Sequence, residues 1–173
     1  MKKVFLLAFI FAFGIFSAHA ADLKIGYLDF HKALNESNEG KKASKVLEDM
    51  ISKKEKIFNG KKEEIKKLDE ELKKQASVLT PETTNDKQEN LSKLYRDYQR
   101  MVKDFQEELK KKEADLRQVI EKDLFKIIID IGKEDGYAYI FEVNAGGLLY
   151  YQEKFDITGK TIKLYNKAAK NKK

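Results

Sequence analysis

The chain has 173 residues, of which 37% are charged, and it contains one proline, nine glycines and no cysteine. The absence of cysteine excludes disulfide bonds and lipid attachment through an N-terminal cysteine. The formal net charge of +6 would fit a nucleic-acid partner, but acidic and basic residues are interleaved along the chain, which indicates solvated helix faces and no nucleic acid.

The first twenty residues predict a signal peptide that is removed during export. Lys2 and Lys3 precede an apolar run over 4–16, and residues 18–20 (Ala-His-Ala) form a small-x-small cleavage pattern. The run is shorter than the roughly 20 residues that span a bilayer, so we favour a signal peptide over a retained anchor. Cleavage removes 2 of the 35 basic residues and leaves 33 against 29 acidic ones, a net charge of +4. The predicted compartment is the periplasm.

The mature chain begins with a short apolar segment over 24–29 that predicts a β-strand. A helical turn is predicted over 30–34. Ser37 is suited to cap the helix that follows, because its hydroxyl can accept a hydrogen bond from a free N–H of the first turn. These residues therefore precede the long helical middle of the chain and form a separate zone.

The middle of the chain predicts two long amphipathic helices, from about Gly40 to Leu79 and from Pro81 to about Asp135. Thr80 can cap the second helix, with Pro81 in its first turn, where no N–H is needed. A short connection makes consecutive helices antiparallel neighbours. At about 1.5 Å per residue, each of these arms would extend over roughly 60–75 Å.

Apolar residues recur every eleven positions along both arms, a period that predicts helix pairing with little or right-handed supercoil. Three lysines interrupt the predicted contact stripe, which makes it thin and polar in places. The apolar rows are Leu94, Phe105, Leu116 and Ile127; Tyr98, Leu109, Ile120 and Ile131; and, in the first arm, Val46, Ile57, Leu68 and Leu79, with Lys54, Lys61 and Lys112 as the interruptions.

After the arms the chain predicts a β-hairpin and a final short helix. Gly136 is suited to end the second arm, and the segments 137–143 and 148–151 flank a turn signal of Asn, Ala and two glycines. The last helix would carry Ile162 and Leu164, before a basic tail over 170–173.

The predicted fold class is α+β, a small β-rich association body that carries a long antiparallel α-hairpin resembling a coiled coil. The body is discontinuous, over 21–39 and 136–169, and the arm covers 40–135 with its turn near 80–85. About 50 residues form a marginal core without disulfides or metal, so we expect the body to oligomerise. Its candidate association residues are Ile25, Tyr27, Leu28, Ile140, Phe141, Val143, Leu148, Leu149 and Tyr150.

No catalytic or metal-binding constellation is recognisable. His31 is the only histidine of the mature chain, so neither a histidine-based triad nor a multi-histidine zinc site can be assembled. Acidic pairs on the arms lie among lysines on helices that offer no dry, concave setting. The sequence therefore predicts a protein that is not an enzyme and that needs no cofactor or metal.

The arms offer apolar and basic side chains for weak, multi-point contact with an unfolded polypeptide. Most aromatic residues could equally lie in the contact between the arms, but a two-helix hairpin cannot cover all of them. The candidate client-binding residues are Phe58, Lys93, Tyr95, Arg96, Tyr98, Arg100, Met101, Lys103 and Phe105.

Short motifs spread over the mature chain resemble the Skp/OmpH family of periplasmic chaperones. They lie at 25–29 (IGYLD), 34–37 (LNES), 40–43 (GKKA), 79–82 (LTPE) and 144–150 (NAGGLLY). The resemblance implies a homotrimer whose arms enclose unfolded outer-membrane β-barrel proteins without ATP. Contact with a membrane surface or lipopolysaccharide is a further partner class that the sequence leaves open.

A structural alternative fits the same elements. An exported α-hairpin could space or tether components of the cell envelope without holding any unfolded client. The two hypotheses differ in whether the protein keeps a denatured β-barrel protein soluble after dilution from urea.

Overall fold

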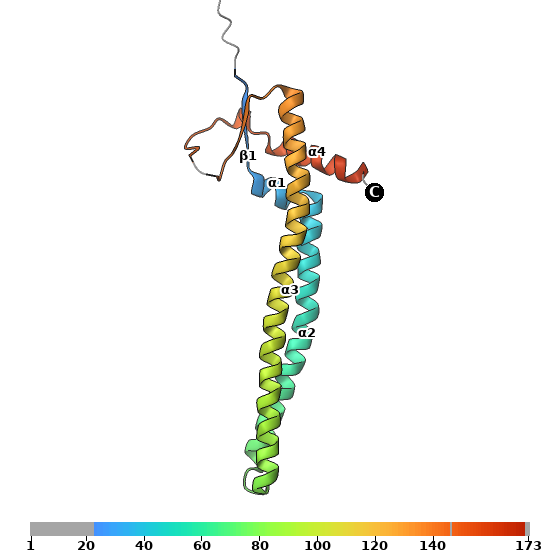
Figure 1. Cartoon of the computed structure of the whole chain (residues 1–173), viewed down its shortest axis with the longest axis vertical. Helices are drawn as coiled ribbons and strands as arrows, with labels where there is room; N and C mark the ends of the chain where they lie inside the picture. Colours follow the sequence, from blue (N-terminus) through green and yellow to red (C-terminus); the bar gives the residue numbers. More distant parts are fainter. Residues whose placement is uncertain (1–22, 146, 172–173) are drawn as a thin grey trace, which may run out of the picture.

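The computed structural model describes residues 23–145 and 147–171, so the predicted signal peptide lies outside the described residues. Within the described part of the chain, no helix is both long enough and apolar enough to cross a membrane. Figure 1 shows two long helices that extend away from a group of shorter elements. We call this group, together with the adjoining end of the second long helix, the body; it comprises residues 23–37 and 120–171.

The two long helices are α2 (Asn38–Gln75) and α3 (Pro81–Asp135). They lie side by side along the length of α2, and α3 continues beyond it into the body (Figure 1). Because a five-residue connection over 76–80 joins them, they run antiparallel. At about 1.5 Å per residue, α3 is about 80 Å long.

The ends of the long helices follow local capping chemistry. The Thr80 hydroxyl accepts a hydrogen bond from the Thr83 N–H at 3.3 Å, and Gly136 ends α3 in the left-handed conformation with φ of 73°. Helix α2 ends at Gln75, four residues before the predicted boundary at Leu79. Beyond Gln75 the chain forms a turn, in which the Gln75 carbonyl accepts both the Val78 N–H at 3.0 Å and the Leu79 N–H at 3.1 Å.

The predicted contact rows are confirmed for α3 and partly wrong for α2. All eight predicted row residues of α3 are buried or half-buried, with Phe105, Ile120 and Ile131 the deepest. In α2, by contrast, Val46 and Ile57 are exposed. The inner positions lie one residue further along, at Leu47 and Phe58, and continue through Ile65 and Leu72. The apolar period predicts that contact residues recur at a fixed spacing along the helix. Which of two neighbouring positions faces the partner helix depends on a small rotation of the helix about its axis.

Strand β1 (Ile25–Leu28), helix α1 (Phe30–Glu36) and the start of α2 form a tight N-terminal corner. The Asp29 carboxylate caps α1 by accepting the Lys32 N–H at 2.8 Å, and the Ser37 hydroxyl caps α2 by accepting the Gly40 N–H at 3.0 Å. A side chain on Gly40 would collide with the Leu34 carbonyl oxygen, so the corner between the two helices requires glycine there.

The predicted β-hairpin is wrong. Strand β2 (Tyr139–Glu142) pairs in parallel with β1, with Ile25 opposite Tyr139, and residues 148–151 form no strand. On its other edge β1 is occupied by the bridge between Tyr27 and Asp156. The sequence pattern predicted that β2 would pair with the segment that follows it in the chain. In the structure, the end of α3 instead places β2 beside β1, a strand more than a hundred residues earlier.

The C-terminal region contains a single 3-10 turn, η1 (Glu153–Phe155), and helix α4 (Thr158–Asn171). Helix α4 lies across the helix pair at the body (Figure 1). It is longer than predicted and includes Lys170 and Asn171, which the sequence assigned to a basic tail; residues 172–173 lie outside the described chain. The Thr161 hydroxyl donates a hydrogen bond to the Ile157 carbonyl at 2.9 Å, and Thr161 is buried.

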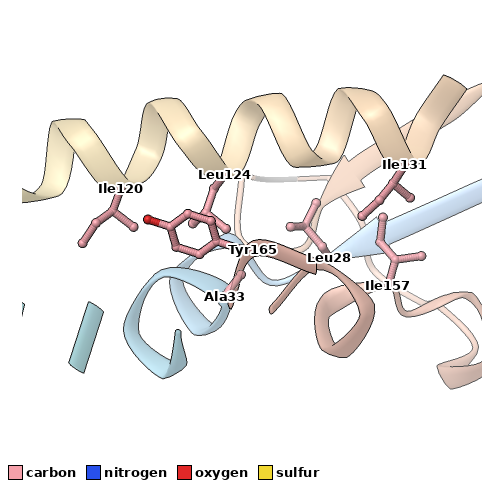
Figure 2. Packing of buried hydrophobic residues seen from close by; sticks show 7 residues of the cluster. All are labelled: Leu28, Ala33, Ile120, Leu124, Ile131, Ile157 and Tyr165. Atoms are coloured by element: carbon pink, nitrogen blue, oxygen red, sulfur yellow. The ribbon is translucent and has the colours of Figure 1, made fainter. Parts of the chain in front are cut away.

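The hydrophobic core lies where the last turns of α3 cross β1, α1 and α4. Figure 2 shows Leu124 and Ile131 of α3 pointing toward side chains from these other elements. None of the elements buries its apolar face alone, so their packing depends on segments far apart in the sequence. The buried cluster consists of Leu28, Ala33, Ile120, Leu124, Ile131, Ile157 and Tyr165.

A charged cluster ties the ends of these elements together. Lys160 of α4 forms an ion pair with the Asp135 carboxylate at the end of α3, and Lys24 donates to the Asp135 carbonyl at 2.9 Å. The Lys24 ammonium also lies 4.2 Å from the centre of the Tyr137 ring. The hydrogen bond from Lys160 lowers the pKa of the Asp135 carboxyl below its usual range.

We expect the Asp135→Asn substitution to lower the free energy of unfolding at neutral pH. Because the pKa of Asp135 is lower in the folded chain, its contribution is complete above the unfolded value of about 3.9 and is lost as the pH falls through the folded value. The difference between variant and wild type should therefore shrink below about pH 4. Urea unfolding at fixed protein concentration measures this difference in the free energy of unfolding. The control is Asp130→Asn, a substitution at an exposed position of α3. A difference that is the same at pH 7 and pH 3 would contradict the assignment.

Candidate functional site

The body carries a surface rich in exposed apolar side chains, which we call the body surface. Leu149 is 98% exposed and Tyr150 is 78% exposed, although both belong to the segment that the sequence identified as apolar. A groove of about 780 Å³ runs beside β1 within this surface. The exposed members of the surface are Leu23, Ile25, Tyr139, Phe141, Leu149, Tyr150, Tyr151 and Phe155.

Strand alternation creates this surface. Side chains alternate between the two faces of a strand, so in β2 Ile140 packs on the core while Tyr139 and Phe141 face outward, with ring centres 6.1 Å apart. Tyr27 of β1 is buried, and its ring centre lies 4.2 Å from that of Tyr151. An exposed apolar patch of this kind is typical of a surface that contacts another molecule.

The structure divides the predicted association residues between core and surface. Tyr27 and Leu28 are buried, and Ile140, Val143 and Leu148 are half-buried. Ile25, Phe141, Leu149 and Tyr150 remain exposed and belong to the body surface. Four further members of the surface were not predicted from the sequence, although the aromatic residues near both strands are a signal for three of them: Leu23, Tyr139, Tyr151 and Phe155.

Three predicted client-binding aromatics lie between the arms. The Phe58 ring centre is 6.2 Å from that of Tyr98 and 5.6 Å from that of Phe105. Phe105 is only 7% exposed, and Met101 is half-buried beside it on α3. Direct contact of the Phe105 ring with another molecule would require the arms to separate. These aromatics therefore hold the arms together.

Lys54 lies in the same contact between the arms, and its surroundings explain how this contact accommodates a lysine. Its ammonium lies 5.5 Å from the centre of the Phe105 ring and 3.8 Å from a Glu108 carboxylate oxygen on α3. The aliphatic stem can pack along the apolar stripe while the charge reaches its rim. Lys61 and Lys112, the other two predicted interruptions, are exposed.

The other predicted client-binding residues lie on the outside of α3. Lys93, Arg96, Arg100 and Lys103 are exposed and share one helix face, because they follow a spacing of three, four and three residues. We call them the arm row. Tyr95 is 53% exposed and lies on a different side of the helix. The structure therefore separates the basic residues from most of the aromatic ones.

The arms as a whole carry almost no net charge. Residues 38–135 contain 24 lysines and arginines against 23 aspartates and glutamates. Ion pairs such as Lys73 with Asp69, at 2.6 Å, connect neighbouring turns, and this hydrogen bond raises the pKa of Lys73. Because charges of both signs alternate, the arm row is a local basic feature and not part of a generally positive arm.

The described residues show no grouping of histidine, cysteine, aspartate or glutamate suited to hold a metal ion. His31 is exposed at the start of α1 and lines a shallow, largely apolar depression with Phe30 and Phe125, whose rings stack at 4.9 Å. This depression contains one further ionisable side chain, Glu142, and that carboxylate accepts the Phe30 N–H at 2.8 Å. Glu142 therefore acts as a cap for α1.

Comparison with protein families identifies the chain. Residues 24–165 match the family described as outer membrane protein (OmpH-like). The chain belongs to the OmpH-like family. The match covers the two strands, both long helices and most of α4, so the resemblance predicted from the short motifs is confirmed.

A solved structure has the same fold. It is a protein from Caulobacter crescentus CB15 proposed to be an outer membrane chaperone (OmpH-like), with a TM-score of 0.76. The similarity covers 84% of this chain and 85% of that one, at 14% sequence identity. A comparison with curated proteins finds no significant match. At this identity the likeness concerns the fold.

The position of the aromatics predicts a difference between two substitutions on the OmpH-like arm. Phe105→Ala should destabilise the arms by about 3 kcal/mol, because it removes a buried ring and leaves a cavity. Tyr95→Ala should cost well under half as much, since that ring is half exposed. Hydrogen exchange of α2 and α3 and thermal unfolding measure both. Equal loss in the two variants would mean that Phe105 does not hold the arms together.

Proposed function

We propose that the chain is an ATP-independent periplasmic holdase that binds unfolded outer-membrane β-barrel proteins between its helical arms and prevents their aggregation. Family membership over 24–165 supports this most directly, together with a fold neighbour proposed to be an outer membrane chaperone. The arms extend away from the body, so that most of their surface is free to contact another polypeptide (Figure 1). The proposal assigns no catalysis to the chain.

The proposal includes a homotrimer assembled through the body surface. Apolar side chains as exposed as Leu149 and Tyr150 are costly in water and gain free energy when another copy covers them. Strand β2 also has a partner on only one edge within the described chain, and an open strand edge favours pairing with another chain. Three bodies joined in this way would hold three pairs of arms around a common cavity.

Client binding in this proposal is diffuse. The aromatics between the arms are occupied by each other, so an unfolded polypeptide would meet exposed residues such as Tyr95 and the arm row. Weak contacts of this kind, repeated along the arms, can retain a chain that has no fixed structure. Since the arms are nearly neutral overall, attraction by the arm row acts over short distances and should be screened by salt.

The first test concerns assembly. Sedimentation equilibrium at micromolar concentration should give a trimer, and the double substitution Leu149→Glu and Tyr150→Glu should produce smaller species, because two charges would be buried in the interface. Val78→Glu, at the exposed connection between α2 and α3, is the matched control and should leave the trimer intact. A folded wild-type monomer, or a trimer that the double substitution leaves unchanged, would contradict assembly through the body surface.

The second test concerns holding of clients. A β-barrel protein diluted from urea should stay soluble when the chain is present without ATP. Replacing all four residues of the arm row by Gln should slow capture severalfold at physiological salt, and the difference should disappear at about 1 M salt, where the Debye length falls to about 3 Å. Turbidity and stopped-flow fluorescence measure the two effects.

The control for the arm row removes four charges elsewhere on the arms. Gln replaces Lys45, Lys53, Lys56 and Lys62, which are exposed on α2. An equal slowing in both variants would assign capture to total charge and not to the arm row. Wild-type protein that suppresses no aggregation at either salt concentration would favour the spacer or tether hypothesis instead.

A further inference from the structure

The corner between α1 and α2 is a break of one residue. Helix α1 ends at Glu36, α2 begins at Asn38, and Ser37 alone lies between them, with φ of −63° and ψ of 156°. This φ already has the helical value, so only the ψ of Ser37 is extended. Between residues 30 and 75 the sequence contains no proline. Rotation about this one ψ bond would therefore join α1 and α2 into a single continuous helix.

The side chain of Ser37 satisfies the backbone groups at the corner in the bent form. Its hydroxyl donates to the Leu34 carbonyl at 2.8 Å and accepts the Gly40 N–H at 3.0 Å, and the residue is completely buried. In a continuous helix these groups would instead bond along the backbone, the Leu34 carbonyl to the Asn38 N–H and the Gly40 N–H to the Glu36 carbonyl. Both forms therefore leave the two backbone groups paired, as a two-state corner requires.

Gly40 is fitted to the bent form alone. A Cβ atom built on it would lie 1.9 Å from the Leu34 carbonyl oxygen, because the corner brings that carbonyl against the start of α2. A continuous helix has room for a Cβ atom at every position, and glycine disfavours it about fivefold relative to alanine. Glycine at this position therefore shifts the balance toward the bent form.

Helix α4 is bonded to the chain on both sides of this corner. Near its start, the Thr158 hydroxyl accepts the N–H of Asp29, the residue immediately before α1, at 2.9 Å. Further along α4, the Asn166 side-chain oxygen accepts the N–H of Asn38, the first residue of α2, at 2.8 Å. An N–H at this position has no partner within its own helix. A helix attached before and after the corner holds the angle between α1 and α2.

Straightening of the corner would withdraw α1 from the core. Ala33 of α1 is completely buried and belongs to the same cluster as Tyr165 of α4 (Figure 2). The Phe30 ring, at the start of α1, stacks on Phe125 with 4.9 Å between the ring centres. A continuous helix would carry Ala33 and Phe30 away from these partners, since α1 would then follow the axis of α2. The core contacts and α4 therefore favour the bent form together.

We propose that α4 is a strap that keeps a two-state corner at Ser37 bent, and that release of this strap lets α1 and α2 join into one helix over 30–75. The joined helix would leave the body in a different direction, so the strap sets the direction of α2 at the base of the arm. Two packings of one segment form a switch when a few contacts decide between them. The inference goes beyond the proposed holdase function and does not depend on it.

The first test replaces Gly40 by alanine in the mature protein. Gly40→Ala introduces the collision with Leu34 in the bent form and favours the continuous helix about fivefold by propensity alone. The corner should therefore convert to the joined form. The backbone carbon chemical shifts of Ser37 in nuclear magnetic resonance distinguish an extended from a helical ψ and should move to the helical range, while residues 30–36 stay helical.

Gly60→Ala is the matched control for this substitution. It lies on the same helix, at a position where an added Cβ atom meets nothing within 4 Å. It should gain the same helix propensity and leave the Ser37 shifts as in the wild type. Ser37 shifts that stay extended in Gly40→Ala would overturn the two-state corner. Loss of the helical signals over 30–36 would overturn it as well, because the corner would then unfold locally and not straighten.

The second test releases the strap without changing the corner itself. Asn166→Ala removes the oxygen that accepts the Asn38 N–H, which should raise the population of the joined form about fivefold. Asn166→Asp keeps an acceptor and should behave as the wild type, and Asn171→Ala, at the exposed end of α4, is the control. Relaxation dispersion of the Ser37 signals measures the population. An unchanged population in Asn166→Ala, or an equal rise in Asn171→Ala, would overturn the role of α4 as a strap.

Discussion

The packing of the last turns of α3 against β1, α1 and α4 is the contact on which the rest of the structure depends. Leu124 and Ile131 are almost completely buried there, among side chains that come from both ends of the described chain. The same continuous helix also forms one of the arms. Burial of a few apolar residues therefore sets the direction of an arm about 80 Å long. A loss of this core would release both the body and the arms.

The contact between the arms is less uniformly apolar than this core. Apolar residues follow it along its length, but Lys54 enters the contact and satisfies its charge at the rim, on the Phe105 ring and Glu108. Much of each helix remains exposed on both sides of the stripe. A thin contact of this kind costs little to deform, which suits arms that would adapt to polypeptides of many shapes. The rings of Phe58, Tyr98 and Phe105 provide its most continuous apolar part.

Charge and apolar surface are separated along the molecule. Among the described residues, the body surface holds most of the exposed aromatic side chains, the arms hold nearly balanced charges, and α4 holds four lysines and no acidic residue. This separation suits each region to a different kind of contact: burial of apolar area at the body, contacts of both charge signs on the arms, and attraction of negative charge at α4. A single average charge for the chain conceals it, because the excess over the acidic residues comes from a short C-terminal segment.

The sequence by itself determined the helical arms, the caps at Ser37, Thr80 and Gly136, and the family, because helix periodicity and capping are encoded within a few neighbouring residues. Only the tertiary structure decided that β2 pairs with β1, since that pairing depends on where a 55-residue helix ends. It also decided that Leu47 and Phe58 face the partner helix while Val46 and Ile57 do not. Among the predicted client-binding residues, the sequence could not separate those that lie between the arms from those in solvent. That separation is set by the rotation of one helix against the other, which no local pattern specifies.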